Sequence, residues 1–426
     1  MKISFRTVSR SSVLCLALLA AATCQTGCLG TLVSGAVSGS TELYKDHFGS
    51  RSFVKKANLF GGRVEEVIER TAKADMLRGR FTDVPPCVQV IYRVPVEGSS
   101  APVRGEVLLP CADWNGTVRV LGCEGPGGGF NLSAPQFLKE GAAVVSCDGG
   151  MNFVRTRDGS ADPVGAGAQR SAAREVFLQS ALHAATAAGK ELVAAYYGKP
   201  VEKTVFSGRE TGAAQGLFLA ERFPEDVDAL ELVNPAIDFW SALAYNVNVS
   251  SRIREASGRV ILRDRQCAAV VSAAKELAAD QKIDEAEFFE RAAKFEPSFT
   301  FGHTRERVCR MWHEILSAET ISSNLAVRVA TPELGSDLTP FIRAKPWRVQ
   351  WIFGVNELGH GVTPEKLLAA RDACAALTPS CDLSAFAARG GTCAITIEKN
   401  NVFVPPSLAE QDLGKIKGLK PTVKKQ

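Results

Sequence analysis

Short apolar segments that alternate with helix-forming segments dominate the middle of the chain. Helix-forming composition is clearest over 168–197, where Leu178 and Leu182 lie one helical turn apart. Strands that alternate with helices in this way form a mostly parallel sheet with helices on both faces. The pattern therefore predicts an α/β fold. The segments that read as strands are 103–109, 117–123, 142–146, 201–206, 229–233 and 393–397.

Composition and charge narrow the function classes. Of the 426 residues, 46% are hydrophobic and 23% are charged, which is typical of a globular protein. The formal net charge of +4 arises at the two ends, because residues 1–27 carry three basic residues and residues 415–426 carry five lysines, with no acid in either. The rest of the chain holds 42 basic and 46 acidic residues, a net charge of −4. A nucleic-acid binder needs a basic face, so we expect no nucleic-acid partner.

The first 28 residues have the layout of an export signal. Three basic residues precede a ten-residue apolar core, Val13 to Ala22, which has signal-peptide length and is too short to cross a membrane. A small residue precedes Cys28, as in a bacterial lipoprotein signal, in which that cysteine is lipidated; Cys24 and a plain secretory signal are the alternatives. We expect an exported protein, anchored in the bacterial cell envelope through Cys28 or else periplasmic or secreted, with a flexible tether over 29–50.

The cysteine count agrees with export. Nine cysteines lie beyond residue 28, so at least one is unpaired within a monomer. Disulfides are permitted in an exported chain, and no C-x-x-C pair suggests a zinc ribbon or a thioredoxin-type centre. The pairing stays open. These cysteines are at 87, 111, 123, 147, 267, 309, 374, 381 and 393.

One strand-to-helix junction carries the clearest chemical signal. The run Phe206-Ser207-Gly208-Arg209-Glu210-Thr211-Gly212 joins a strand to the helix over 213–223. A strand, then Gly-x-X-x-Gly, then a helix is the frame of a nucleophile elbow, a turn so sharp that small residues must flank the central one. An ordinary tight turn with two glycines has the same pattern. Here the central residue is Glu210, which becomes the first candidate catalytic residue.

Further motifs lie in order around this junction. They are Asp113-Trp114-Asn115-Gly116, the Gly-rich loop Gly122 to Gly129, Ser146-Cys147-Asp148-Gly149, His183 with Lys190, and the run from Ser207 to Ala236. In this order, residues 103–240 resemble the tannase and feruloyl esterase family of α/β-hydrolases. Cys147 stands where that family has Thr. The resemblance implies an α/β-hydrolase fold with an inserted lid, and hydrolysis of phenolic esters.

The resemblance also implies a division of the chain. The first part of the α/β-hydrolase core covers 51–240, the lid 241–340 and the second part of the core 341–410. The basic tail, 411–426, we expect to be a disordered, solvated end.

The departures from the family pattern fall on the catalytic residues. The family has Cys-Ser where this chain has Arg209-Glu210, and that Cys pairs with a Cys after the catalytic His, so Cys393 would lack its family bridge. The Ser is the acyl-transfer nucleophile of a Ser-His-Asp triad. No His follows His360 in the chain.

The acid position allows two alignments. The segment 351–357 places Glu357 at the acid, with His360 three residues further on; the segment 382–386 places Asn401 there instead. Both alignments lose the triad His. By resemblance, backbone N–H groups of Gly127, Gly128 and Thr211 would form an oxyanion or substrate-binding site.

No cofactor and no metal are expected. The resemblance implies a calcium loop in the lid, and its counterpart, Glu276 to Ile283, has lost both glycines of the sharp turn that calcium ligands need. His303, Cys309 and His313 complete no known metal-ligand spacing.

We therefore predict an exported α/β-hydrolase, similar to tannases and feruloyl esterases, that binds a small phenolic ester or a related ligand but has lost triad catalysis. Membrane contact is expected only through the lipid anchor. Two alternatives stay open. One is an active hydrolase that uses Glu210 with Glu357 and His360, and the other is a non-enzymatic envelope binding protein.

Overall fold

The computed structural model describes a central sheet, its helices and the C-terminal segment. The chain divides into two units, Met1–Lys55 and Lys56–Gln426; in the first unit the described part is the short helix η2, Arg51–Lys55. The described residues are 51–70, 79–97, 102–123, 129–150, 154–155, 161–162, 176–238, 241–242, 245–246, 249, 378–398, 401 and 403–426.

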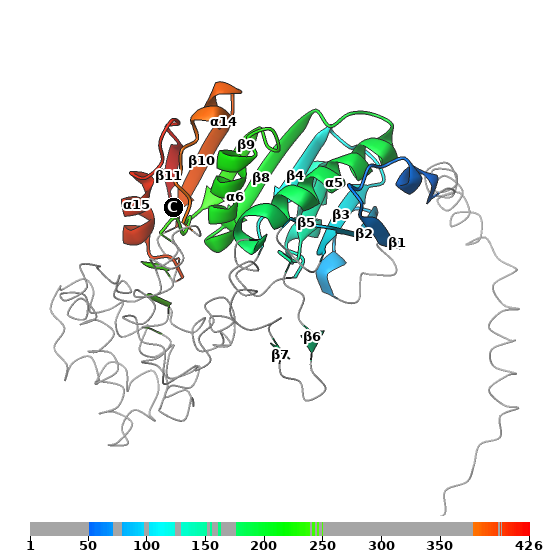
Figure 1. The fold of residues 1–426 in the computed structure, drawn as a ribbon, viewed down its shortest axis with the longest axis horizontal. Helices are drawn as coiled ribbons and strands as arrows, with labels where there is room; N and C mark the ends of the chain where they lie inside the picture. The colour runs from blue at the N-terminus through cyan, green and yellow to red at the C-terminus, as the bar shows by residue number, and fades with distance from the viewer. Residues whose placement is uncertain are drawn as a thin grey trace, which may run out of the picture. The chain divides into compact units, whose positions relative to one another are not determined.

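The second unit is built on a nine-stranded sheet with the order β1-β2-β3-β5-β4-β8-β9-β10-β11 (Figure 1). The five neighbouring pairs from β5 to β11 are parallel, whereas β1, β2, β3 and β5 pair antiparallel. The expected mostly parallel sheet is confirmed. Its strands are β1 Arg63–Arg70, β2 Cys87–Val94, β3 Val103–Pro110, β4 Thr117–Leu121, β5 Ala143–Cys147, β8 Lys203–Arg209, β9 Ala229–Val233, β10 Thr392–Ile397 and β11 Thr422–Lys425. A separate two-stranded ribbon consists of β6 Val154–Arg155 and β7 Ala161–Asp162.

The strand β5, near the centre of the sheet, is buried along its whole length. All five residues of β5 are buried, because the strand is covered on both faces, and such strands read as continuous apolar runs. In β9 buried residues alternate with more exposed ones, the period of a strand with one covered face.

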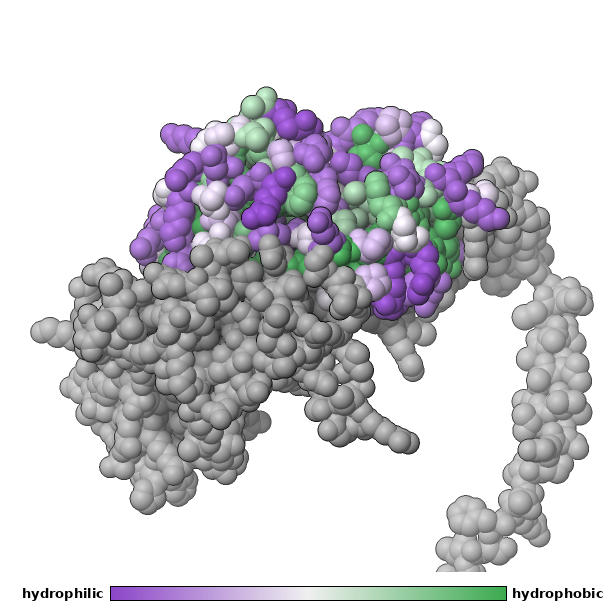
Figure 2. Space-filling model, in the orientation of Figure 1, coloured by the Kyte–Doolittle hydropathy of each residue, from purple (hydrophilic) through white to green (hydrophobic). Residues whose placement is uncertain are grey.

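Two helices lie side by side against one face of the sheet (Figure 1). The first, α5 (Ala181–Tyr197), continues a π-helical turn at Val176–Ser180, so the expected helix over 168–197 is confirmed from residue 176 onward. The second, α6 (Thr211–Arg222), follows the elbow. Both helices bury leucines toward the sheet. Among the coloured residues in Figure 2, hydrophilic side chains cover most of the visible surface. The other helices are η3 Gly79–Phe81, η5 Ala134–Glu140, α14 Ser384–Ala388 and α15 Pro406–Leu413.

The C-terminal segment differs from the expectation. Residues 422–425 are not a disordered end: they form β11, which pairs in parallel with β10. Lys425 also forms an ion pair of 2.8 Å with Glu410 of α15, and Lys415 one of 2.7 Å with Asp412. Backbone pairing leaves lysine side chains free to reach water, so a basic composition does not exclude a strand.

The chain order creates one switch point in the sheet. From β4 the chain passes to β5 on one side, and it later returns to form β8 on the other side of β4. In open α/β sheets ligands bind at such points, outside the carboxyl ends of the strands. The carboxyl ends of β4 and β8 carry the Gly-rich loop and the elbow. None of the described helices is long and apolar enough to cross a membrane.

Candidate active site at the carboxyl ends of β4 and β8

The elbow has the strained backbone that its sequence predicts. Glu210 lies between β8 and α6 with φ 53° and ψ −116°, a left-handed conformation that side chains other than glycine rarely adopt. Its N–H donates to the carbonyl of Val233 at the end of β9, and its carbonyl accepts from Ala214 and Ala236. These three hydrogen bonds hold the residue in a conformation it would not adopt alone.

Three glycines make the turn possible. A Cβ atom on Gly208 would lie 2.5 Å from the carbonyl oxygen of Gly212, and one on Gly122 would lie 2.6 Å from that same oxygen. A Cβ on Gly212 would lie 2.9 Å from the carbonyl oxygen of Cys123. The end of β4 and the start of α6 therefore touch through their backbones, which brings the Gly-rich loop next to the elbow.

The Glu210 side chain is partly buried and hydrogen-bonded to an amide. Asn401, in the segment after β10, donates from Nδ2 to Glu210 Oε1 over 2.9 Å. Burial raises the pKa of Glu210 above its usual range, and the hydrogen bond from Asn401 and the charge of Arg209 offset only part of this effect. The neutral acid is therefore favoured more than for a solvated glutamate. Among the described residues, Oε2 has no hydrogen-bond partner.

The backbone fixes which way the Asn401 amide points. Its Oδ1 accepts from the N–H groups of Phe403 and Val404, at 3.1 and 2.9 Å, so its NH₂ group must face Glu210. Two alignments competed for the acid position, and Asn401, the residue that one of them placed there, lies at the elbow in the structure. Glu357 of the other alignment lies outside the described residues.

An ion pair joins the same two strand ends. Arg209 donates to both carboxylate oxygens of Glu398, which directly follows β10, at 2.9 and 2.5 Å. Glu398 raises the pKa of Arg209 through this hydrogen bond. Asn234, buried after β9, accepts from the Glu398 N–H at 2.8 Å. Arg209 thus contacts the segment after β10 through charge, where the resembling family has a disulfide.

The start of the Gly-rich loop is tied down from two sides. The Cys123 N–H donates to Oε1 of the buried Gln215 in α6, and Gln215 in turn donates to the carbonyl of Phe177. From the other side, Asn131 Nδ2 donates to the carbonyl of Gly122 over 2.9 Å. Gln215 and Asn131 were not predicted as site residues; a polar residue on the apolar face of a helix was the available signal for Gln215.

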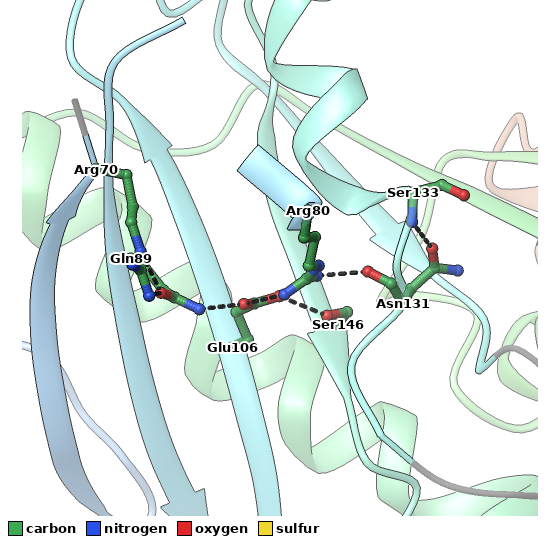
Figure 3. A network of polar contacts seen from close by, with 7 residues as sticks. All are labelled: Arg70, Arg80, Gln89, Glu106, Asn131, Ser133 and Ser146. Carbon is green, nitrogen blue, oxygen red and sulfur yellow. Dashed lines mark hydrogen bonds and ion pairs between the residues drawn. The ribbon is translucent and has the colours of Figure 1, made fainter. Parts of the chain in front are cut away.

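A buried charged network stands behind Asn131 (Figure 3). Arg80 donates two hydrogen bonds of 2.6 Å to the carboxylate of Glu106, whose side chain is fully buried, and a third to the carbonyl of Asn131. Gln89 and Ser146 also donate to Glu106, at 2.5 and 3.0 Å. Arg70 donates to Gln89 and extends the network to β1. The network therefore links four strands of the sheet to the segment that holds Gly122.

His183 of α5 is the one histidine in the described part of the chain, and it lies away from the elbow. Its Nδ1 is 2.7 Å from Asp226 Oδ2, and its ring stacks on Phe223 at 3.7 Å. Asp226 precedes β9, whereas Glu210 is bonded to the last residue of β9. The two sites are thus at opposite ends of this strand, so His183 cannot serve the elbow.

Of the other residues predicted for the site, Thr211 lies in the part of the chain that the structure describes. Thr211 is the first residue of α6, so its N–H has no acceptor within the helix and is placed as an anion-binding donor would be. The other candidates, Gly127, Gly128, Glu357, His360 and Cys28, lie outside the described residues. So do the calcium-loop counterpart Glu276 to Ile283 and the metal candidates His303, Cys309 and His313. Six cysteines lie in the described part of the chain, and the structure draws no disulfide among them: 87, 111, 123, 147, 381 and 393.

Sequence comparison points to one family. Residues 87–286 match the family model described as "Tannase and feruloyl esterase". The chain is 33% identical over 156 residues to a probable feruloyl esterase B-2 of Aspergillus flavus, covering 34% of this chain and 26% of that protein. It is 26% identical over 150 residues to the mono(2-hydroxyethyl) terephthalate hydrolase of Piscinibacter sakaiensis, covering 33% and 24%. The chain therefore spans about a quarter of the length of these relatives.

Solved structures agree on the fold. Feruloyl esterase B from Aspergillus oryzae superposes with a TM-score of 0.64 at 17% identity, covering 87% of this chain and 78% of that one. Tannin acyl hydrolase from Aspergillus niger gives 0.59 at 15% identity, covering 86% and 76%. Similarity at this identity establishes the fold alone, and it confirms the expected α/β-hydrolase architecture. By sequence, residues 87–286 are similar to the tannase and feruloyl esterase family, and by structure the chain has the α/β-hydrolase fold.

Proposed function

We propose that this protein binds a small phenolic ester, or a related ligand, at the elbow without hydrolysing it. The hydrogen bond between Glu210 and Asn401 carries the proposal. In a serine esterase the elbow nucleophile gives its proton to a histidine, which the acid holds from its other side. Here the longer Glu210 side chain reaches the segment after β10 directly, so the place of that histidine is taken.

The missing groups account for the lost chemistry. Glu210 cannot act as the alkoxide of a serine, and the chain has no histidine after His360. Removing the nucleophile or the histidine of a serine protease lowers kcat by about 10⁶. We therefore expect no turnover that depends on the elbow.

The same geometry suits binding. Burial raises the pKa of Glu210 and so increases the share of the neutral acid, in which Oε2 can donate while Oε1 accepts from Asn401. A carbonyl or phenol oxygen of a ligand would accept that proton. The Thr211 N–H, next to it at the start of α6, would provide a second donor.

A second candidate function is hydrolysis with Glu210 as a carboxylate nucleophile, with Glu357 and His360 activating water. The raised pKa of Glu210 argues against it, because it reduces the share of the carboxylate, which is the nucleophilic form. The similarity to proteins named as probable feruloyl esterases, which are hydrolases, supports this alternative.

Hydrolysis of methyl ferulate and methyl gallate separates the two candidates. We expect the purified protein and Glu210→Ala to release product at the same background rate, while calorimetry detects saturable binding of either ester to the native protein alone. Turnover that Glu210→Ala or His360→Ala abolishes would establish the hydrolase instead. Absence of both binding and turnover would leave neither candidate standing.

We also propose export and lipidation at Cys28, on the support of the basic, apolar and small-residue pattern of residues 1–28. Metabolic labelling with a fatty acid in a bacterial host should mark the wild-type protein and Cys24→Ser, but not Cys28→Ser. Equal labelling of both variants, or none in the wild type, would contradict lipidation at Cys28.

A further inference from the structure

Two buried cysteines lie side by side at the carboxyl ends of neighbouring strands. Cys123 comes two residues after β4, and Cys147 is the last residue of β5; the two strands are parallel, with Val120 opposite Val145. The Cys123 thiol donates to the carbonyl of Cys147 over 3.5 Å, so the Cys123 sulfur packs directly against residue 147. Both residues are almost fully buried.

We propose that Cys123 and Cys147 form a disulfide that fixes the start of the Gly-rich loop to β5. This is not the family bridge at the elbow, because Cys147 stands where the family has Thr and Arg209 occupies the elbow position of that bridge. The bridge does not depend on the proposed ligand.

The surroundings favour a bond over two packed thiols. A Cβ atom on Gly149 would lie 3.3 Å from Cys123 Sγ, so this glycine leaves room beside the sulfur. The two cysteines are 24 residues apart, and closing a loop of that size restricts the unfolded chain. Because both sulfurs are buried, a finished bridge is shielded from external thiols, as a structural disulfide must be.

The bond forms by thiol–disulfide exchange with a protein or glutathione disulfide. One cysteine thiolate attacks the oxidant, and the second displaces it, so that both cysteines lose their hydrogens and the oxidant becomes two thiols. The hydrogen bond with Cys123, together with burial, raises the pKa of the Cys147 thiol, which makes its thiolate scarce in the folded protein. Oxidation should therefore take place while the chain folds.

The sequence offers a direct test. Trypsin cleaves after Arg119, Lys139 and Arg155, so Cys123 is the only cysteine in peptide 120–139 and Cys147 the only one in peptide 140–155. The full chain is refolded in a buffer of reduced and oxidised glutathione, its free thiols are alkylated under denaturing conditions, and it is digested without reduction. We expect the two peptides to appear joined, two hydrogens lighter than their sum, and to separate after reduction.

Two variants and a thermal measurement complete the experiment. Cys147→Thr should lose the joined peptide, whereas Cys381→Ser, which changes another buried cysteine, should keep it. A reductant should lower the melting temperature of Cys381→Ser and leave that of Cys147→Thr unchanged. Recovery of 120–139 and 140–155 only as separate alkylated peptides in the wild type would overturn the proposal, as would a joined peptide linking Cys123 to a different cysteine. The wild-type map decides the matter even where a variant fails to fold.

Discussion

Replacing Arg80 by Met removes the only cationic partner that the structure gives to the fully buried carboxylate of Glu106 among the described residues. Arg80 donates two charge-assisted hydrogen bonds of 2.6 Å, each worth about 1.5–3 kcal/mol. Removing one partner of a buried ion pair costs about 3–5 kcal/mol overall. Gln89 and Ser146 continue to donate to the carboxylate, so we expect the lower end of that range, about 3 kcal/mol.

A double-mutant cycle isolates the pair. Glu106→Gln keeps the side-chain shape but leaves the Arg80 guanidinium facing a neutral amide, so it should also destabilise the protein. Combining Arg80→Met with Glu106→Gln should cost about 2 kcal/mol less than the sum of the single changes, because the double variant has no unpaired charge.

Urea unfolding followed by circular dichroism at pH 7 measures all four proteins. Lys139→Met is the matched control: its ion pair with Asp83, at 3.0 Å, is exposed, and such pairs contribute little. Single variants that lose less than about 1 kcal/mol, or a double variant additive within about 0.5 kcal/mol, would refute the reasoning. The same network supports Asn131 and Gly122, so ligand binding should weaken in the destabilised single variants.

Three further changes test the elbow and its surroundings by urea unfolding. Burial raises the pKa of Asp148 to about 6, so its contribution to the free energy of unfolding should fall as pH rises from about 4 to about 6. Asp148→Asn should abolish this contribution and raise the free energy of unfolding at pH 7 by about 1–3 kcal/mol. A lower free energy of unfolding for the variant at pH 7 would contradict this reasoning. Gly212→Ala should destabilise the protein by about 1–3 kcal/mol, because the new Cβ would lie 2.9 Å from the Cys123 carbonyl oxygen. The control Gly414→Ala should have no measurable effect, because its Cβ would lie 3.7 Å from the nearest atom, the Gln411 carbonyl oxygen. Asn401→Asp places a second carboxyl beside Glu210, which raises the pKa values of the pair; the variant should lose more stability at pH 7 than at pH 4.5, and equal losses would argue against this reading.

The elbow was predictable because its cause is local. Gly208 and Gly212 flank Glu210 within five residues, and a Cβ atom at either glycine would clash with neighbouring backbone atoms. The sequence pattern therefore specified the turn, the strand before it and the helix after it. The parallel strands were predictable for a similar reason, since apolar runs such as β5 are required wherever both faces are covered.

The partners of the elbow were not predictable, because they come from distant parts of the chain. Asn401 is 191 residues from Glu210, and two alignments competed for its position. Nothing in the sequence singled out Arg80 and Glu106. The fold brings Arg80, from the short helix η3, onto the fully buried carboxylate of Glu106 in β3. The strands β1 and β2 were missed, as was β11, whose lysines suggested a solvated tail.

The lysines of β11 have a further consequence for how copies of this protein meet. As the last strand of the described sheet, β11 presents one unpaired row of backbone N–H and C=O groups, a template onto which another chain could add. The exposed Lys424 and Lys425 oppose such edge-to-edge pairing through charge repulsion, and Arg63, Glu65, Glu66, Glu69 and Arg70 give the opposite edge strand, β1, a similar density of charge. Both borders of the sheet are thus protected against aggregation, and neutralising the two lysines should make the protein self-associate at concentrations where the native chain does not.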